Sequence, residues 1–201
     1  NSAEGFLRQV IGWREYIWNC YWQWMPNYAQ MNELSAVQPL PKLFTAPEKT
    51  HMSCMKSVLE GVYEHSYAHH IERLMVLGNF SLIAGINPQE LTQWMWNSFV
   101  DAAEWVMVPN VVGMSQFAEG GSFTTKPYLS GSNYVLKMSD HAKGPWCATW
   151  DGLFWSFIAD HPEFFGKNPR LSMMAKSWEK MPAAKQAEHR KNAAMFLDQL
   201  R

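Results

Sequence analysis

The sequence predicts an all-α fold, and three features of the chain lead to that prediction. Apolar side chains recur every three or four residues, as in Phe6, Val10, Trp13, Ile17 and Tyr21, which is the spacing of one helix face. No segment shows the alternation of a half-buried strand, and the sequence contains no repeat or low-complexity tract. With 201 residues, 47% of them hydrophobic, the chain can also bury a sizeable core.

The first predicted helix covers residues 4–25 and ends at Pro26, since proline cannot continue a helix. Residues 26–50 contain several prolines and little periodicity, which indicates a loop. The next predicted helix covers residues 52–77, and the Gly-Asn pair at 78–79 is a typical C-terminal stop.

A short helix is expected over residues 79–85. Asn87 is suited to cap the following helix, and Pro88 to its first turn. We expect that helix to run to about Met107, where the Pro-Asn pair at 109–110 breaks it.

The segment 110–134 is rich in glycine and small residues, which predicts a long loop. A loop of this length in a compact domain is usually functional or disordered, and the apolar residues in this one favour order. The remaining predicted helices span residues 147–160, 171–181 and 183–200.

Charge and cysteine content limit the class of protein. The 17 basic and 18 acidic residues nearly cancel, so global charge predicts neither a nucleic acid nor a membrane as partner. Three scattered cysteines cannot form a disulfide framework, which favours a reducing, cytoplasmic setting. No signal peptide and no apolar run of about 20 residues is present. The sequence lacks an initiating Met and opens within a helical pattern, so we expect a C-terminal piece of a longer protein.

Eleven tryptophans and thirteen methionines are unusual for a chain of this length. Tryptophan at this density indicates a large flat ligand, an electron-transfer chain, or a wide aromatic core without further function.

Two adjacent histidines, His69 and His70, lie within the predicted helix 52–77. Neighbouring positions on a helix point about 100° apart, so the two rings cannot share one environment. Histidine changes protonation most easily near neutral pH, so the pair suggests proton transfer; ordinary packing is the alternative. On a continuous helix His65, His69 and Glu72 would share a face, a spacing that could also hold a metal, although no HExxH motif accompanies it.

Several common motifs are absent from the sequence. There is no CxxC pair for a zinc ribbon, no GxGxxG or P-loop for a nucleotide phosphate, and no GxSxG elbow. A nucleotide ligand would therefore need another mode of binding.

A second polar cluster begins in the last turns of the helix expected to reach Met107. A helix would place Asp101, Glu104 and Trp105 on one face, and the glycine-containing segment 109–121 follows. Such a surface would suit an extended aromatic ligand with hydrogen-bonding edges. A helix cap with a packed loop is the structural alternative.

Several ordered segments together resemble the photolyase/cryptochrome superfamily, beginning with Gly12-Trp13-Arg14-Glu15-Tyr16. The further segments are 63–75, 101–121, 126–128, 132–134 and 137–140. They are similar to the deoxyribodipyrimidine photolyase-related branch, the bacterial (6-4) photolyases and cryptochromes that often carry an iron–sulfur cluster. The resemblance covers nearly all of residues 4–165. It implies that residues 1–201 are the C-terminal part of the helical, FAD-binding catalytic domain, without the N-terminal α/β domain that holds the antenna chromophore.

The resemblance implies noncovalent FAD and light-dependent repair of pyrimidine (6-4) photoproducts in UV-damaged DNA, by electron transfer from reduced FAD. It places the catalytic proton donors at His69 and His70, and the lesion pocket at Tyr128. The implied FAD-binding residues are Gln9, Arg14, Asp101, Glu104, Asn110, Gly113 and Met114. Arg14 could instead contact DNA phosphate, since guanidinium binds phosphate through two hydrogen bonds. We expect a monomer.

Two features depart from the family pattern. Trp94 matches the family's electron-transfer chain, but the next position is Met95, a poor hole carrier, so Trp96 or Trp105 would have to substitute. Of the four cluster cysteines only Cys54 and Cys147 match, and two thiolates cannot hold a four-iron cluster in the usual way. We therefore predict no iron–sulfur cluster and no metal, with tryptophans such as Trp146 and Trp150 filling the space.

Two other functions stay open from the sequence. One is a cryptochrome-like flavin photoreceptor that signals without repairing DNA. The other is a helical module without cofactor, if the segment lacks too much of the flavin pocket.

Overall fold

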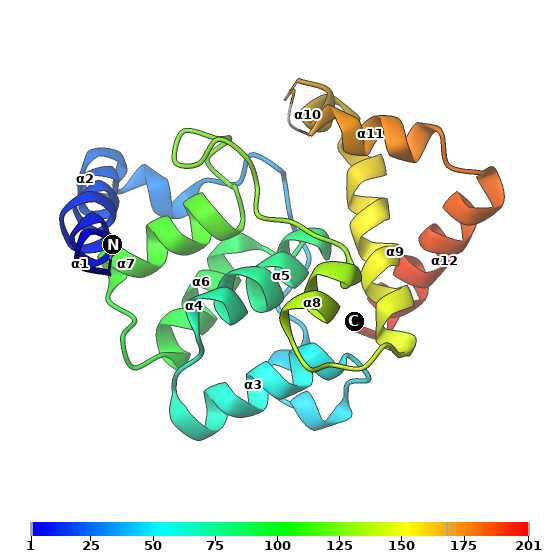
Figure 1. The fold of residues 1–201 in the computed structure, drawn as a ribbon, viewed down its shortest axis with the longest axis horizontal. Helices are drawn as coiled ribbons and strands as arrows, with labels where there is room; N and C mark the ends of the chain where they lie inside the picture. The colour runs from blue at the N-terminus through cyan, green and yellow to red at the C-terminus, as the bar shows by residue number, and fades with distance from the viewer. Residues whose placement is uncertain (1, 168, 170, 201) are drawn as a thin grey trace.

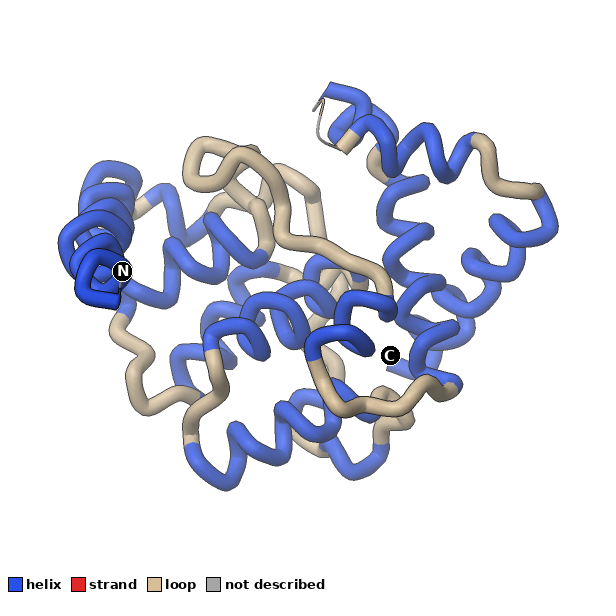
Figure 2. Tube along the Cα trace, viewed as in Figure 1, coloured by secondary structure: helices blue, strands red, loops and turns tan. Residues whose placement is uncertain are grey.

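The computed structural model describes residues 2–167, 169 and 171–200, and over this range the predicted all-α fold is confirmed (Figure 1). Helices and connecting loops make up the described chain, which contains no β-strand (Figure 2). A parallel bridge between Gln38 and Ile86 is the one β-type pairing among these residues. No described helix is both long and apolar enough to cross a membrane.

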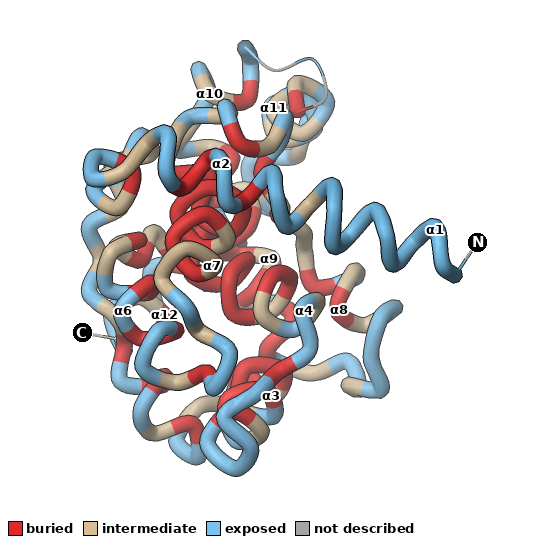
Figure 3. The backbone as a smooth tube through the Cα atoms, turned by 90° about the vertical axis from the view of Figure 1, so that its left-hand side faces the viewer, coloured by how far each residue is buried: buried red, intermediate tan, exposed pale blue. Residues whose placement is uncertain are grey.

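The N-terminal helix forms as predicted. It consists of α1 (Ser2–Leu7), the π-helical segment η1 (Arg8–Trp13) and α2 (Arg14–Trp24). Figure 3 shows that the α1 end stands clear of the rest of the chain and is exposed all round. Only α2 contributes buried side chains, Ile17, Cys20 and Tyr21, because it packs against α7 (Glu104–Val108).

The predicted loop 26–50 contains only short 3-10 turns among its described residues. They are η2 (Asn27–Gln30), η3 (Lys42–Phe44) and η4 (Pro47–Lys49). The segment carries the buried rings of Tyr28 and Phe44 into the core, so it is an ordered part of the fold.

The prediction of one helix over residues 52–77 is wrong. Helix α3 (Ser53–His65) ends at Ser66, whose φ of +51° lies in the left-handed region. The next helix starts only at His70, because His69 and Glu72 form a capping box: the His69 side chain accepts a backbone N–H and Glu72 accepts the N–H of His69.

The predicted helix stop at residues 78–79 is also wrong. Helix α4 (His70–Glu72), the π-helical η5 (Arg73–Gly78) and α5 (Asn79–Ile83) follow one another without a break. Gly78 serves close packing instead: a Cβ atom there would lie 2.1 Å from Ser115 Oγ. The predicted end at Gly85 fits better, since Gly85 has a φ of +67°.

The helix predicted from Asn87 to Met107 is two helices. Asn87 caps α6 (Pro88–Ser98) as expected, its Oδ1 accepting the N–H groups of Gln89 and Glu90 at 2.8 and 3.1 Å. Helix α7 starts only at Glu104. Asp101 therefore lies in the link between the two helices and shares no helix face with Glu104 and Trp105.

Pro109 does not break the chain as predicted. It opens the π-helical η6 (Pro109–Ser115), which continues directly from α7 with helical backbone angles at both Val108 and Pro109. The predicted loop 110–134 is correct only from Gln116 to Gly131, and α8 (Ser132–Met138) follows it.

The C-terminal helices form largely as predicted. Helix α9 (Pro145–Asp160) and α12 (Ala183–Leu200) pack along each other at one end of the molecule (Figure 1). Their contact is close at Gly152, where a Cβ would lie 2.9 Å from the His189 carbonyl oxygen. Two shorter helices connect them, α10 (Pro162–Lys167), which was not predicted, and α11 (Ser172–Glu179).

Arg73 joins the two chain breaks that the sequence did not predict. Its Nε donates to the Ala68 carbonyl at 2.8 Å, and its two terminal nitrogens bind both oxygens of Asp101 at 2.8 and 3.1 Å. The guanidinium also lies 4.1 Å from the ring centroid of Phe99 and 4.9 Å from that of Tyr67. We call this group, Arg73 with Tyr67, Ala68, Phe99 and Asp101, the Arg73 cluster.

We expect Arg73→Lys to lower the free energy of unfolding by about 2 kcal/mol, since an ammonium group cannot form the bidentate pair and the bond to Ala68 together. Denaturant unfolding measures the change. Arg190→Lys is the matched control, because the Arg190–Asp160 pair is more exposed and should contribute about 1 kcal/mol or less. Equal effects of the two substitutions would contradict the importance given to the Arg73 cluster.

Unfolding should also depend on pH through His189, which is 6% exposed on α12. Burial, with the Lys185 charge second, lowers the pKa of His189 below its usual 6.5. Below about pH 6.5 the histidine binds a proton more readily in the unfolded chain than in the folded chain. The free energy of unfolding should therefore fall as the pH drops from about 6.5.

His189→Leu should reduce this acid sensitivity, measured as the difference in unfolding free energy between pH 7 and pH 5. The exposed His65 provides a control, and His65→Leu should leave the difference unchanged. An unaltered pH dependence in His189→Leu would show that other groups cause it.

Candidate functional site

A cavity of about 330 Å³ lies between the N-terminal helix and the segments η5, α6 and η6. Among the described residues three segments are π-helical, η1, η5 and η6, and all three contribute to its lining. Insertions of π-helical geometry often mark functional sites, because the extra residue in the turn redirects neighbouring side chains. The volume suits a ring system of moderate size.

The cavity wall is mostly apolar with a few polar groups. Leu74, Val106, Val111 and Met114 supply apolar surface. Asn110 lines the same wall and is fixed in orientation, since its Nδ2 donates to the Val106 carbonyl at 2.8 Å. Such a mixture suits a flat, largely apolar ligand with hydrogen-bonding edges.

The two histidines have different surroundings. His70 lines the cavity, whereas His69 is the cap of helix α4. His69 Nδ1 accepts the Ile71 N–H at 3.2 Å, so its ring proton lies on Nε2. Loss of water around the ring, followed by the charges of Arg73 and His69, lowers the pKa of His70, although part of the residue stays open to solvent.

The structure does not place His65, His69 and Glu72 where they could bind a metal together. The chain break at Ser66 separates His65 from the helix of His69 and Glu72, so the three side chains share no helix face. Within the described part of the chain, no three His, Cys, Asp or Glu side chains lie together as a metal site.

Five of the sequence-predicted site residues line the cavity. They are Gln9, His70, Asp101, Asn110 and Met114. Asp101 lines the cavity as a member of the Arg73 cluster. Arg73 binds both of its carboxylate oxygens and so holds the side chain in place.

Three other predicted cofactor residues do not line the cavity. Glu104 is in the first turn of α7 and interacts with Tyr21. Gly113 is required by packing: a Cβ there would lie 2.2 Å from Tyr28 Oη. Arg14 pairs with Glu15 on the surface and lies 5.6 Å from the ring centroid of Trp105.

The predicted electron-transfer residues do not line the cavity; their neighbour Met95 does. Trp94 is buried against Phe44 and Phe99, with ring centroids 4.9 and 6.0 Å away. Trp96 is 40% exposed. Trp105 is half-buried and meets Trp18 edge to face at 5.2 Å.

Tyr128, predicted to line the lesion pocket, is half-buried outside the cavity. It packs on the cluster of Leu74, Met75 and Phe123, the same cluster that contacts Trp13. Leu74 and Met114 of that cluster also line the cavity, so Tyr128 packs on the same apolar cluster as part of the wall.

The two cysteines that match the family's cluster ligands lie in the main core with Trp146 and Trp150. Burial raises the pKa of the Cys54 thiol to about 12, and the charge of Cys147 adds to the shift. Cys20 belongs to a different apolar cluster, with Ile17 and Met114. The prediction that these residues hold no cluster stays a prediction.

Sequence reasoning missed Arg73 and Trp13 as residues of the site. Both line the cavity, and both lie in segments that the sequence pattern singled out for other reasons. An arginine three residues after His70 was a usable signal, since a nearby positive charge lowers the pKa of a histidine. Nothing in the sequence indicated that Arg73 pairs with Asp101, which lies 28 positions further along the chain.

Comparison with known proteins gives two relatives, while no protein-family model matches the chain. A (6-4) photolyase of Agrobacterium fabrum is 41% identical over 210 aligned positions, which include the whole of this chain and 41% of the relative. The uncharacterized protein R855 of Acanthamoeba polyphaga mimivirus is 46% identical over 85 residues, 42% of this chain and 69% of that protein.

The chain thus spans about two fifths of the length of the photolyase that it matches. The match extends over the cavity, both histidines and the Arg73 cluster, since it covers every residue of the chain. Identity at this level over a helical fold of 201 residues shows common ancestry, and the chain is a photolyase-related protein.

Proposed function

We propose that this chain forms the flavin- and lesion-binding region of an enzyme that uses light to repair (6-4) photoproducts in DNA. The observation that carries the proposal is the cavity that joins His70 to Asn110 and Met114, in a chain related over its whole length to a (6-4) photolyase. The proposal extends to the whole protein, of which this chain would be one part.

The cavity residues fit the ring system of FAD. The apolar side chains Val111 and Met114 would contact the flat faces, while Asn110 and Gln9 offer amide groups to the polar edge. At about 330 Å³ the cavity has room for the ring system rather than for a whole dinucleotide. When bound and reduced, FAD would supply a light-activated electron.

The histidine pair would supply the proton that repair of this lesion requires. His69 carries its proton on Nε2, which leaves that N–H free to donate outside the helix. His70, whose pKa is lowered, is neutral at pH 7 and can accept and return a proton at the cavity wall. The capping box fixes the backbone from which both rings project.

Damaged DNA would reach the cavity as a flipped-out nucleotide, as in other enzymes that act on a base. Arg14, whose side chain is 55% exposed, directly follows the lining residue Trp13 and would contact DNA phosphate. Tyr128 would support the lesion pocket from behind. Trp94, with Trp96 or Trp105, remains our proposal for the residues that re-reduce the flavin.

We expect Asn110→Ala to weaken FAD binding about tenfold, since one oriented amide would be lost from the ligand-facing wall. Quenching of flavin fluorescence on titration with the protein measures the affinity. Asn97→Ala on the exposed face of α6 is the matched control and should bind FAD normally. Unchanged affinity in Asn110→Ala would place the flavin elsewhere, and no binding by the unmodified chain would support the cofactor-free alternative.

The capping role of His69 allows a sharper test of proton donation. Asparagine is a good N-cap, so His69→Asn should keep the helix start, whereas His69→Ala should lose about 1 kcal/mol of stability. Both variants should lose (6-4) repair by about a hundredfold or more while retaining flavin, because neither has an imidazole.

Illumination of a (6-4) lesion oligonucleotide with the full-length protein measures repair, and denaturant unfolding measures stability. Repair by His69→Asn at the unmodified rate would reduce His69 to a helix cap. Flavin photoreduction in the unmodified protein without lesion reversal would support the photoreceptor alternative instead.

A further inference from the structure

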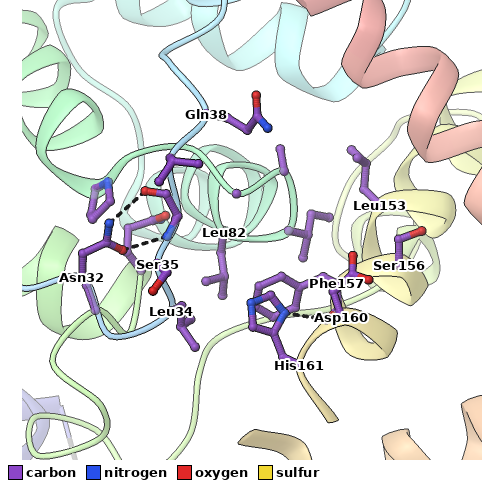
Figure 4. Close-up of a pocket in the computed structure, with 18 of the residues that line it drawn as sticks. Asn32, Leu34, Ser35, Gln38, Leu82, Leu153, Ser156, Phe157, Asp160 and His161 are labelled. Atoms are coloured by element: carbon purple, nitrogen blue, oxygen red, sulfur yellow. Dashed lines mark hydrogen bonds between the residues drawn. The ribbon is translucent and has the colours of Figure 1, made fainter. Parts of the chain in front are cut away.

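A second cavity, of about 230 Å³, lies on another side of the fold and shares no lining residue with the first (Figure 4). Its walls are the segment 32–38, the end of α5 and one face of α9 and α12. Leu82, Leu153 and Phe157 provide apolar surface. No step of the proposed repair reaction uses this cavity.

His161 presents a hydrogen-bond acceptor to the second cavity. Its Nδ1 lies 2.8 Å from the Phe157 carbonyl oxygen, which can only accept, so the ring proton is on Nδ1. In this tautomer the Nε2 atom carries the lone pair. His161 lines the cavity, and no described residue binds this nitrogen.

Gln38 presents a donor and an acceptor from a different wall. Its backbone is held by Gly85 and Asn87, through bonds of 2.9 and 2.8 Å. The side-chain amide has no hydrogen-bond partner among the described residues, although Gln38 is half-buried and lines the cavity. Figure 4 shows Gln38 and His161 at opposite ends of the lining.

Ser156 adds a buried polar atom without a partner. The residue is 8% exposed and lines the cavity, and its Oγ makes no hydrogen bond within the described structure. Buried hydroxyls are nearly always satisfied, so an orphan hydroxyl in a cavity wall indicates a ligand or solvent partner.

We propose that the second cavity binds a free purine base of the adenine type. A glutamine amide pairs with the N6 and N7 atoms of adenine through two hydrogen bonds, which assigns that edge to Gln38. The N9–H group at the other end of the ring matches the acceptor Nε2 of His161. The apolar side chains between these ends suit the flat faces of the base.

The size and charge of the cavity agree with this ligand. The volume is smaller than that of typical drug-sized sites, and a single bicyclic ring needs less room. The carboxylate of Asp160 at the edge is paired with Arg190 at 2.6 Å, so the site does not demand a cation. A sugar on N9 would remove the donor that His161 needs, so the site should prefer the base to the nucleoside.

Gln116 connects this cavity to the first. It lines the second cavity, and its Nε2 donates to Ser115 Oγ and to the Gly78 carbonyl, at 2.9 and 3.0 Å. Ser115 lines the first cavity, and Gly78 ends the π-helical segment η5. A base bound in the second cavity would thus contact the same side chain that joins η5 to η6.

The test is equilibrium dialysis of the chain with radiolabelled adenine, in excess FAD so that the flavin cavity is closed to the base. We expect one adenine per chain and affinity about tenfold or more lower for Gln38→Leu and His161→Phe. Gln93→Leu, the same change on the exposed face of α6, and His65→Phe are the matched controls and should bind adenine normally. Adenosine should bind at least about tenfold more weakly than adenine.

Absence of adenine binding would overturn the proposal, and so would binding that Gln38→Leu leaves unchanged. Adenine binding that FAD abolishes would assign the base to the flavin cavity and overturn it as well. If His161→Phe fails to fold, Gln38→Leu decides alone, since the Gln38 side chain makes no hydrogen bond to any described residue. If the chain does not bind FAD, that result counts against the proposed function and not against the second cavity. Dialysis of adenine without FAD then tests the second cavity in the same variants.

Discussion

The site depends on the ion pair between Arg73 and Asp101. Arg73 has a side chain that is 14% exposed, and it binds a carboxylate, a backbone carbonyl and two aromatic rings at once. Because the partners come from two separate links, 66–69 and 99–103, the guanidinium fixes both chain breaks relative to η5. Without it, the segment that carries both histidines would keep its capping box, the bond from the Val100 N–H to the Ser66 carbonyl and the buried Ala68, but would lose the charged anchor that the guanidinium provides.

Close backbone approach shapes the rest of the cavity. Gly78 lets η5 approach Ser115 of η6, and Gly113 lets η6 approach Tyr28 from the opposite side. A side chain at either glycine would push η6 away from its neighbours. The π-helical turns and the two glycines thus act together. The π-helical turns redirect the lining side chains, and the glycines keep the wall closely packed.

The two cavities meet at neighbouring residues of one segment. Ser115, the last residue of η6, lines the first cavity, and the next residue, Gln116, lines the second. The Gln116 amide donates to Ser115 and to the Gly78 carbonyl. Packed cores switch between discrete arrangements and do not deform continuously. The hydrogen bonds of Gln116 are therefore one route by which a ligand in one cavity could affect the other.

The sequence by itself determined the helical class, the N-terminal helix, the Asn87 cap and the long helices α9 and α12, because these follow from local spacing and capping. It also singled out five residues of the cavity: the residue pattern pointed to His70 and Asp101, and the resemblance added Gln9, Asn110 and Met114. Only the tertiary structure decided the break at Ser66 and the division between α6 and α7, where Arg73 and Asp101, 28 positions apart, pair with each other. A window of sequence shows helical periodicity on both sides of such a break, but the interaction that stabilises it comes from a distant segment.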